Sequence, residues 1–258
     1  MPVELSVIIP VYNEGKIIRR NLEIIDSYVQ TLGLEYEIVV VNDGSSDDTL
    51  QQVTAMIHHP TTSKQLGLLE GKHLCIISYA ENKGKGFAVN RGMITARGRY
   101  RLFMDMDLST ELTEIPKFLQ CVRDGLCDIC VGNRNNIGLL VQKRPWHRAL
   151  LGKIFVFLSS VSSGCQLGDF TCGFKIFTAQ ACEKVFPRQS IYNWAFDTEL
   201  ISIAHQLGLR VHQMPVEWRH HENSKVRIGS AMITSLMSLV KIWCLKGRHK
   251  EGDFYGNN

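Results

Sequence analysis

The sequence lacks the features that divide a chain into several domains or repeats. It has no linker rich in proline, glycine or serine, and no internal repeat. No apolar run reaches the length of about 20 residues that a membrane-spanning helix requires, and the run at 154–161 is far shorter. The first apolar segment begins at Val3 without a charged leader, so we expect no signal peptide. These absences favour one globular α/β domain.

Strong charge and paired cysteine motifs are also missing. The net charge of +4 is small for 258 residues, and no nucleic-acid-binding motif is present, so we expect no nucleic-acid partner. Of the eight cysteines, Cys127 and Cys130 form a lone CxxC motif that no second pair or nearby histidine completes as a zinc site. The alternatives are a redox pair and, more simply, buried reduced thiols in a cytosolic protein.

Apolar runs and helical patterns alternate along the first half of the chain. Strands are predicted at residues 5–12, 36–43, 73–79 and 100–107, and helices at 14–33, 49–58 and 85–98. Continuous apolar runs of this length are typical of parallel strands that are covered on both faces. We therefore predict a single Rossmann-like, mostly parallel sheet flanked by helices. Its ligands should bind beyond the carboxyl ends of the strands, where Tyr12, Asp43 and Asp105 fall.

The alternation weakens after residue 130. A basic, polar loop at 133–152 precedes an apolar helix at 153–163. Further on, the pattern predicts a turn, strand and helix at 166–186, a helix at 194–208, a strand at 210–218 and a final apolar helix from residue 228.

Two aspartates one residue apart end the fourth strand. Side chains alternate along a strand, so Asp105 and Asp107 should lie on one side and repel each other. A divalent cation removes that conflict, and two carboxylates with substrate phosphates are a common way to hold Mg²⁺. The alternative is a solvated turn in which Asp107 caps the next helix.

Four motifs occur in the order typical of one enzyme family: VIIPVYNE at 7–14, VVNDGSSDDT at 40–49, NKGKGFAVNRGM at 82–93 and FMDMD at 103–107. Together they resemble glycosyltransferase family 2, whose nucleotide-sugar domain has the GT-A fold. The resemblance implies that Asp43 accepts hydrogen bonds from the base or ribose, which suits the imide N–H of uracil. It also implies a wall around the nucleoside made by Pro10, Tyr12 and Glu14.

The same resemblance assigns the charged residues of the first half. Asp105 and Asp107 would hold Mg²⁺ or Mn²⁺ against the donor diphosphate, so that the metal neutralises the leaving group. Lys85 would reach the nucleotide, or else be a solvated lysine. Asp47 or Asp48 is interpreted as the N-cap of the following helix.

A dehydrogenase is the main competitor, because βαβ units often bind dinucleotides. That function requires a GxGxxG motif directly after the first strand. The first strand is followed by VYNEGK, with one glycine, and the third glycine of GKGFAVNRG comes too late. The sequence therefore argues against a dehydrogenase.

Motifs of the second half narrow the acceptor. GNR at 132–134, RALLGK at 148–153, DFTCGFKIF at 169–177, FDTELISIAHQLG at 196–208 and VEWRHHENSKV at 216–226 occur in this order. They are similar to the polyprenyl-phosphate glycosyltransferases, the branch that contains dolichyl-phosphate mannose synthase and dolichyl-phosphate β-glucosyltransferase. The residues of the last two motifs resemble those of the glucosyltransferase group more closely.

A lipid phosphate is already anionic near neutral pH, so such an enzyme needs cations rather than a base. Arg134 and Arg148 match the arginines expected to bind the acceptor phosphate, with Arg144 as a rival for the second place. Arg219 and Lys225 match the basic pair expected to close over the donor diphosphate. The alternative for each is an ordinary surface cation.

Asp197 leaves alternatives open, and Ser109 departs from the family pattern. Asp197 matches the general base of relatives with hydroxyl acceptors, and it equally suits a donor-sugar contact or a helix cap. Asp169 and Thr171 are expected to build a tight turn beside the site. Ser109 replaces a glutamine that assists the metal in mannose synthases, which argues against mannose and leaves metal binding intact.

A lipid acceptor requires access to a membrane. We expect residues 1–228 to form the GT-A domain, and residues 229–258 to form an interfacial helix with Trp243 and a basic tail at the lipid headgroups. The alternative is a helix packed on the protein or on a partner. The enzyme would then be peripheral to the cytoplasmic face of a membrane, and a second copy or a membrane protein stays open as a partner.

The leading hypothesis is therefore an inverting, metal-dependent transfer of a hexose, glucose first, from a UDP-sugar to a polyprenyl phosphate. The alternatives are GDP-mannose as donor, a glycan hydroxyl as acceptor, and a catalytically inactive membrane-bound relative. The intact pair Asp105 and Asp107 argues against the last.

Overall fold

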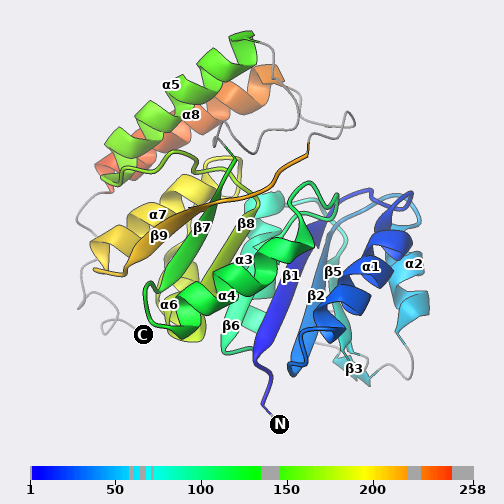
Figure 1. Cartoon of the computed structure of the whole chain (residues 1–258). Coiled ribbons are helices and arrows are strands. Elements are labelled where there is room, and N and C mark those ends of the chain that lie inside the picture. Colours follow the sequence, from blue (N-terminus) through cyan, green and yellow to red (C-terminus); the bar gives the residue numbers. More distant parts are fainter. Residues whose placement is uncertain are drawn as a thin grey trace, which may run out of the picture.

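The computed structural model describes residues 2–57, 61–63, 68–70, 73–134, 146–219 and 228–245. Its strands form one nine-stranded sheet with the order β3-β4-β5-β2-β1-β6-β8-β7-β9 (Figure 1). The strands are β1 (Leu5–Val11), β2 (Tyr36–Asp43), β3 (Thr61–Ser63), β4 (Leu68–Glu70), β5 (Leu74–Tyr79), β6 (Tyr100–Met104), β7 (Ile129–Asn133), β8 (Phe174–Thr178) and β9 (Val211–Pro215).

The centre of the sheet is parallel. Strand β1 pairs with β2 on one side and with β6 on the other, and β2 pairs with β5, all in parallel. Strand β8 runs antiparallel between β6 and β7, while β7 and β9 pair in parallel again. The carboxyl ends of β1, β2 and β6 therefore meet the amino end of β8 at one edge of the sheet.

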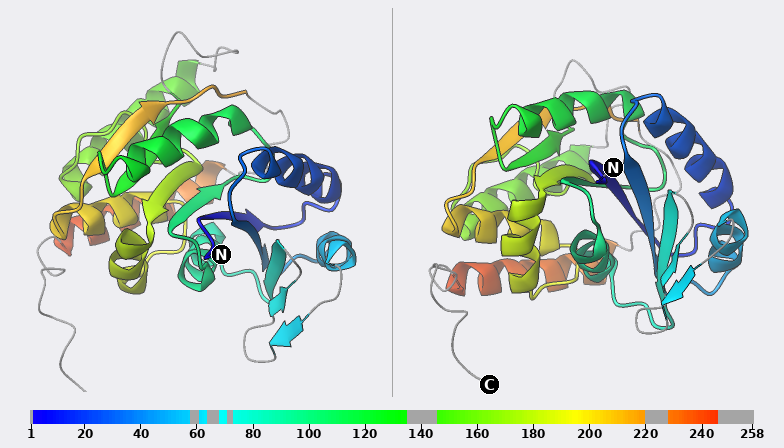
Figure 2. Two further views of the ribbon diagram at one scale, coloured as in Figure 1. Left: turned by 60° about the horizontal axis from the view of Figure 1, so that its bottom comes forward. Right: turned by 90° about the horizontal axis from the view of Figure 1, so that it is seen from below.

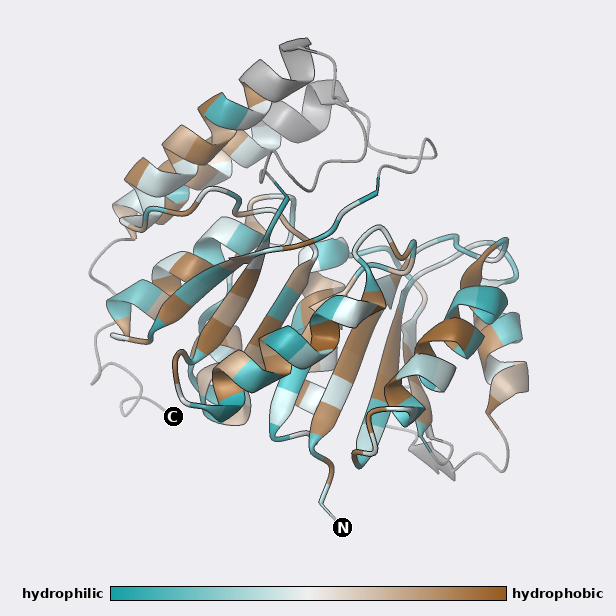
Figure 3. Cartoon of the chain, viewed as in Figure 1, coloured by the Kyte–Doolittle hydropathy of each residue, from teal (hydrophilic) through white to brown (hydrophobic). Residues whose placement is uncertain are grey.

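Helices cover both faces of the sheet, which makes three layers (Figure 2). One apolar core joins the sheet to α1 (Ile18–Gln30), α2 (Thr49–Met56) and α4 (Ile115–Arg123). The opposite core joins it to α3 (Lys85–Thr95), α6 (Ala179–Val185) and α7 (Phe196–Gln206). Hydrophobic residues dominate the strands between these layers (Figure 3), as expected for a sheet that is buried on both sides.

Two long helices, α5 (Trp146–Ser163) and α8 (Ile228–Cys244), lie side by side above α7 and β9 (Figure 1). Leu239 and Ile242 of α8 pack with Phe155 and Leu158 of α5 in a small separate core. The final helix is therefore packed on the protein along one face, which was the alternative to an interfacial helix. Its other face is exposed, so the interfacial prediction stays a prediction.

The predicted α/β architecture is confirmed, and the strands and helices of the first half lie within a few residues of their predicted bounds. The helix predicted to stop at Gly33 ends at Gln30, and Gly33 follows in the left-handed region with φ of 66°. Helix α4, strand β7 and the short strands β3 and β4 were not predicted. The antiparallel direction of β8 follows from pairing with distant strands, which local patterns do not contain.

Candidate active site

The loops after β1 and β2 are joined into one rim. Asn13, which has a left-handed φ of 55°, accepts hydrogen bonds at its side-chain oxygen from the amides of Ser46 and Asp47. The amide of Glu14 donates to Thr49 Oγ1 (2.9 Å), and the Asp47 carboxylate accepts from the amides of Gly15 and Thr49. The predicted cap of α2 is therefore Asp47, since the side chain of Asp48, the residue that directly precedes the helix, makes no capping hydrogen bond.

The predicted nucleoside wall lies on this rim. Pro10 is the second-last residue of β1 and pairs with Val41, and Glu14 lies in the connection to α1. Tyr12 directly follows the strand, and 45% of its surface is exposed. An exposed aromatic ring at this place is free to meet a ligand, and a contact with the nucleoside stays a prediction.

Asp43 ends β2 and is buried (3% exposed). Its carboxylate accepts hydrogen bonds from the amides of Lys83 (2.8 Å) and Gly84 (3.0 Å) and from the side chain of Asn82 (3.0 Å). Burial raises the pKa of Asp43, although the two amide hydrogen bonds act in the opposite direction. Asp43 thus holds the loop before α3, and any contact with a base or ribose would use its remaining acceptor capacity.

Asp105 and Asp107 follow β6 in a turn rather than within the strand. Met106 between them is buried in the core, and both carboxylates lie close enough to Lys85 to act on its charge. Asp107 is exposed and accepts a hydrogen bond from the amide of Ser109 (2.9 Å). The turn contains Leu108 with a left-handed φ of 54°. The alternative in which Asp107 caps the next helix is wrong, because the following helical turn has Glu111 at its N-cap.

Lys85, the first residue of α3, points at this turn. Its Nζ lies 2.5 Å from Asp105 Oδ1, so it is not the solvated lysine of the alternative interpretation. Burial lowers the pKa of Lys85, but the carboxylates of Asp105, Asp197 and Asp107 outweigh burial, and the pKa lies above its ordinary value. The amine therefore stays charged at neutral pH within reach of three acids.

The Asp105 carboxylate packs directly on the backbone of Gly173, just before β8. A Cβ at Gly173 would come within 2.1 Å of Asp105 Oδ2, so a larger residue would displace this carboxylate from its observed position. The turn offers carboxylate oxygens of Asp105 and Asp107, both partly accessible, at the carboxyl edge of the sheet. Such hard oxygen ligands fit Mg²⁺ or Mn²⁺.

Arg134 follows β7 and is held by the loop before β8. Its guanidinium donates to both oxygens of Asp169 (2.7 and 2.9 Å) and to Thr171 Oγ1 (2.8 Å). Burial lowers the pKa of Arg134, but the charge of Asp169 outweighs it and raises the pKa. Asp169 also accepts from the Thr171 amide, which is the predicted tight turn. Asp169 and Thr171 thus hold one edge of the Arg134 guanidinium. Binding of an acceptor phosphate by Arg134 stays a prediction.

Asp197 lies in the first turn of α7 and is buried (3% exposed). It makes no capping hydrogen bond, so the helix-cap interpretation is wrong. Its carboxylate instead accepts from Lys175 Nζ (2.6 Å), and this fully buried ammonium also donates to the Cys172 carbonyl. Burial raises the pKa of Asp197, against the lowering effect of Lys175 and Lys85.

Trp218 and Arg219, which follow β9, contact the residues directly after Asp105 and Asp107. The amide of Arg219 donates to the carbonyl of Ser109 (2.8 Å), and Trp218 forms a bridge with Thr110. The Arg219 guanidinium is 62% exposed and pairs with Glu111 (2.8 Å). This places Arg219 beside the turn of Asp105 and Asp107, where the sequence expects a donor-binding cation.

For three predicted site residues the side chain is outside the described part of the structure. Lys225 and Arg144 lie outside the described residues. Arg148 lies in the first turns of α5, but its side chain is outside the described part of the structure. Their predicted roles stay predictions.

Sequence reasoning missed several residues of the site. Lys175 sits in an apolar strand, and only its charge within FKIFT signals a partner. Two tryptophans also border the cations, since the ring of Trp194 lies 5.9 Å from Lys85 Nζ and that of Trp218 lies 5.9 Å from Arg134 Cζ. Trp218 belongs to the motif at 216–226 but was given no role, and Trp194 lies outside the predicted motifs.

The chain is similar in sequence to members of one enzyme family. The model of glycosyl transferase family 2 matches residues 6–186. The chain is 30% identical over 252 residues to a dolichyl-phosphate beta-glucosyltransferase of Dictyostelium discoideum. This match covers 93% of this chain and 74% of the relative. It is 34% identical over 256 residues to dolichyl-phosphate beta-glucosyltransferase ALG5D of Trichomonas vaginalis, covering 93% of this chain and 73% of the relative.

Solved structures support the fold. Glucosyl-3-phosphoglycerate synthase of Mycobacterium tuberculosis in complex with uridine diphosphate superposes with a TM-score of 0.67 at 18% identity. The match covers 94% of this chain and 80% of the solved chain. A second structure of that synthase, with Mn²⁺, uridine diphosphate and glucosyl-3-phosphoglycerate, gives a TM-score of 0.65 at 18% identity over 94% of this chain and 80% of the solved one. The nine-stranded sheet and its helices thus have the GT-A fold.

Proposed function

The chain belongs to glycosyltransferase family 2 and is a hexosyltransferase, and from this premise we propose that it transfers glucose from UDP-glucose to a polyprenyl phosphate with inversion at the anomeric carbon. One observation carries the proposal. Two acids, Asp105 and Asp107, converge at the carboxyl edge of the sheet with the side chain of Lys85 and with the segment that bears Arg219. Named relatives that act on dolichyl phosphate support the acceptor.

The donor lies, in this proposal, along the edge formed by β1, β2 and β6. Tyr12 and Asp43 border the nucleoside, while Pro10 and Glu14 shape the rim beneath it. Asp105 and Asp107 hold Mg²⁺ or Mn²⁺, and the metal supplies positive charge to the diphosphate leaving group. Structural neighbours that carry Mn²⁺ and uridine diphosphate support a divalent cation and a uridine nucleotide.

Protein cations hold the remaining negative charge. Lys85 is anchored on Asp105 and stays protonated, so it can also face a donor phosphate. Arg219, exposed beside the same turn, closes over the diphosphate together with Lys225. Lys85 is held by Asp105 before substrate arrives, which lowers the reorganisation that the reaction requires.

The acceptor phosphate binds, in this proposal, between Arg134 and Arg148. A phosphate monoester has a second pKa of about 6 and is largely dianionic at neutral pH, so it attacks without a general base. Asp197 supports this acceptor over a hydroxyl, because its carboxylate is buried and bonded to Lys175 rather than presented to solvent. Asp197 instead keeps the ammonium of Lys175 beneath the site.

A lipid acceptor requires a membrane surface close to this edge. Among the described residues, no helix combines the length and hydropathy needed to cross a membrane. We propose that the α5–α8 face docks on the cytoplasmic leaflet instead. This face consists of exposed apolar side chains of the two helices: Leu151, Ile154, Phe157, Val161, Leu236, Met237, Val240 and Trp243. It lies at the end of the molecule that carries the carboxyl ends of the central strands (Figure 1).

The test is a transfer assay with purified protein, Mn²⁺ and a panel of UDP- and GDP-sugars. Acceptors are a polyprenyl phosphate and, separately, oligosaccharides. The expected result is β-linked glucosyl phosphate lipid from UDP-glucose, with its anomeric configuration read by NMR. Asp107→Ala should abolish transfer, and Asp124→Ala, which removes an exposed acid elsewhere, should not. Transfer to saccharides alone, or from GDP-mannose alone, would overturn the proposal.

A further inference from the structure

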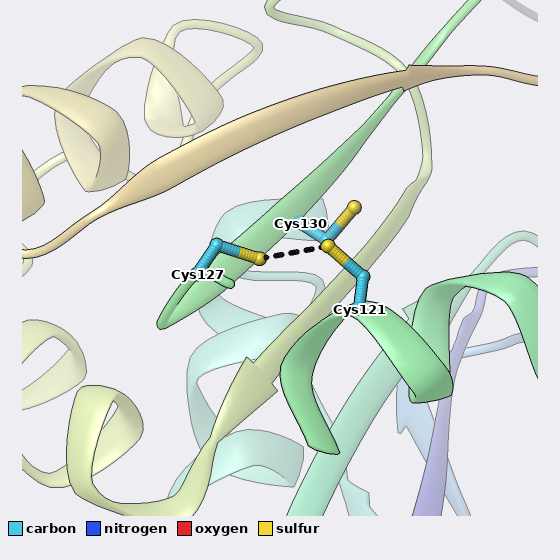
Figure 4. A group of neighbouring side chains, drawn as sticks. All are labelled: Cys121, Cys127 and Cys130. Carbon is cyan, nitrogen blue, oxygen red and sulfur yellow. Dashed lines mark hydrogen bonds between the residues drawn. The ribbon is translucent and has the colours of Figure 1, made fainter. Parts of the chain in front are cut away.

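Three cysteine thiols meet where α4 passes over the start of β7 (Figure 4). Cys121 lies in the last turn of α4, Cys130 is the second residue of β7, and Cys127 lies in the connection between these elements. All three sulfur atoms lie within 4.8 Å of one another, and those of Cys121 and Cys127 are 3.3 Å apart. The structure thus adds a third thiol to the CxxC motif, which sequence reasoning treated as alone.

The cluster is separate from the active site. It lies at the amino end of β7, whereas Arg134 follows the carboxyl end of that strand. Cys121, Cys127 and Cys130 are 5%, 1% and 0% exposed, and they belong to the apolar core that includes α4. The transferase chemistry proposed above uses none of them.

The donor set selects the kind of ligand. Three converging sulfur atoms disfavour Mg²⁺ and Ca²⁺, which prefer oxygen, and favour soft ions such as Cu(I) and Zn²⁺. With a metal–sulfur distance of about 2.3 Å, the sulfur atoms of a trigonal or tetrahedral site stand about 3.8–4.0 Å apart. The sulfur atoms of Cys121 and Cys127 are 3.3 Å apart and no pair is more than 4.8 Å apart, so shifts of less than about 1 Å bring the three to this spacing. We propose that Cys121, Cys127 and Cys130 form a structural site for one soft, thiophilic d¹⁰ metal ion.

Such a site would clamp the helix after the acidic turn to the strand before Arg134. Helix α4 begins shortly after Asp107, and β7 ends next to Arg134, so the clamp connects two elements that position site residues. The connection between Cys121 and Cys127 is short and includes Leu126, whose exposed fraction is 67%. An ion would enter by opening of this surface loop, and its binding would release thiol protons to solvent.

The test loads the full-length, anaerobically reduced protein with Cu(I) or Zn²⁺ in the presence of a competing chelator. We expect one ion per chain and a rise in Tm of about 5–10 °C at a hundredfold excess over Kd. X-ray absorption should find three sulfur neighbours for Cu(I), and three sulfurs with one lighter atom for Zn²⁺. This measurement needs no variant, so it decides the proposal even if a variant fails to fold.

Variants then assign the ligands. Each of Cys121→Ser, Cys127→Ser and Cys130→Ser should weaken binding by more than the roughly 10–100-fold that loss of an outer-shell partner costs. Cys182→Ser removes a buried thiol of α6 and should leave binding unchanged. Fewer than three sulfur neighbours, unchanged binding in the three variants, or a Cys121–Cys127 disulfide in the protein as isolated would each overturn the metal site.

Discussion

At the scale of single residues, the site rests on an ammonium group that solvent does not reach. The side chain of Lys175 is 0% exposed, and its partners are Asp197 and the carbonyl of Cys172. A buried charge of this kind is tolerated only when it is paired and hydrogen-bonded. The ion pair therefore fixes the position of β8 relative to α7, beneath Asp105 and Lys85.

Removing one member of this pair should be more damaging than removing both. Lys175→Met leaves the Asp197 carboxylate buried without its partner, and we expect the free energy of unfolding to fall by about 3–5 kcal/mol. The double variant Lys175→Met/Asp197→Leu should recover much of that loss, because no unpaired charge remains. Urea unfolding measures both values.

Lys153→Met, which removes an exposed lysine of α5, serves as the control and should change stability by no more than about 0.5 kcal/mol. A double variant that is no more stable than Lys175→Met alone would show that the charge pair is not the source of the effect.

The pair of Arg134 and Asp169 makes stability depend on pH. Burial raises the pKa of Asp169, but Arg134 outweighs burial and holds the pKa below the ordinary value of 3.8. The unfolded chain therefore binds a proton more readily near pH 4 than the folded protein does. The stabilisation is present above about pH 4 and is lost as pH falls through the lower folded pKa.

Asp169→Asn should lower the free energy of unfolding on the order of 3 kcal/mol at neutral pH, because Arg134 loses its charged partner. The difference from the parent should shrink as pH falls below about 4, where the parent carboxylate also becomes protonated. Urea unfolding across a pH series measures this trend, with the exposed Asp124→Asn as control. A difference that stays constant down to pH 2 would contradict the linkage.

At the scale of elements, the pairing of distant segments explains what the sequence leaves open. Runs such as LSVIIPVY and YEIVVVND predict β1 and β2 well, because buried parallel strands have a strong local pattern. The reversed direction of β8 depends on hydrogen bonds to β6 and β7 that no local pattern records. The same is true of the cysteine cluster, which requires α4 to lie against β7.

The paired helices α5 and α8 carry the membrane prediction. Replacing Phe157 and Met237, which are 67% and 69% exposed, by glutamate puts two charges on the proposed docking face. Since burial of one such side chain contributes about 1.5–3 kcal/mol, we expect at least a tenfold loss of binding to vesicles with anionic lipid. Vesicle flotation measures the bound fraction.

Leu126→Glu is the matched control, because Leu126 is also 67% exposed but belongs to the loop between α4 and β7. It should leave flotation unchanged. Equal loss in both variants would mean that the α5–α8 face is not the surface that meets the membrane.

At the scale of the whole molecule, the sequence predicts the acids well and the cations less completely. Asp43, Asp105 and Asp107 were expected at the carboxyl ends of strands, and the parallel centre of the sheet brings those ends to one edge. The partners of Lys85 and Asp197 were not predicted, because side chains far apart in the chain meet only through the packing of α3, β8 and α7. Local motifs therefore identify the family, but they do not reveal which charged side chains pair with one another.

The charges at the carboxyl edge of the sheet determine how a diphosphate can bind there. Among the described side chains, the three cations Lys85, Lys175 and Arg134 face four carboxylates, those of Asp105, Asp107, Asp169 and Asp197. Arg219, beside the same turn, is already paired with Glu111, so the described carboxylates here outnumber the cations before any substrate binds. A diphosphate should bind poorly to such a surface unless a divalent cation accompanies it. Donor binding should therefore depend on the metal.

The most direct test is the affinity for UDP, measured by calorimetry with and without Mn²⁺. The parent protein and the control Asp124→Asn should bind UDP at least about tenfold more tightly with Mn²⁺, a gain of about 1.4 kcal/mol. Asp107→Asn should lose this gain while keeping its fold and Tm. Equal UDP affinity of the parent with and without Mn²⁺, or an undiminished gain in Asp107→Asn, would contradict a metal-organised donor site at the end of β6.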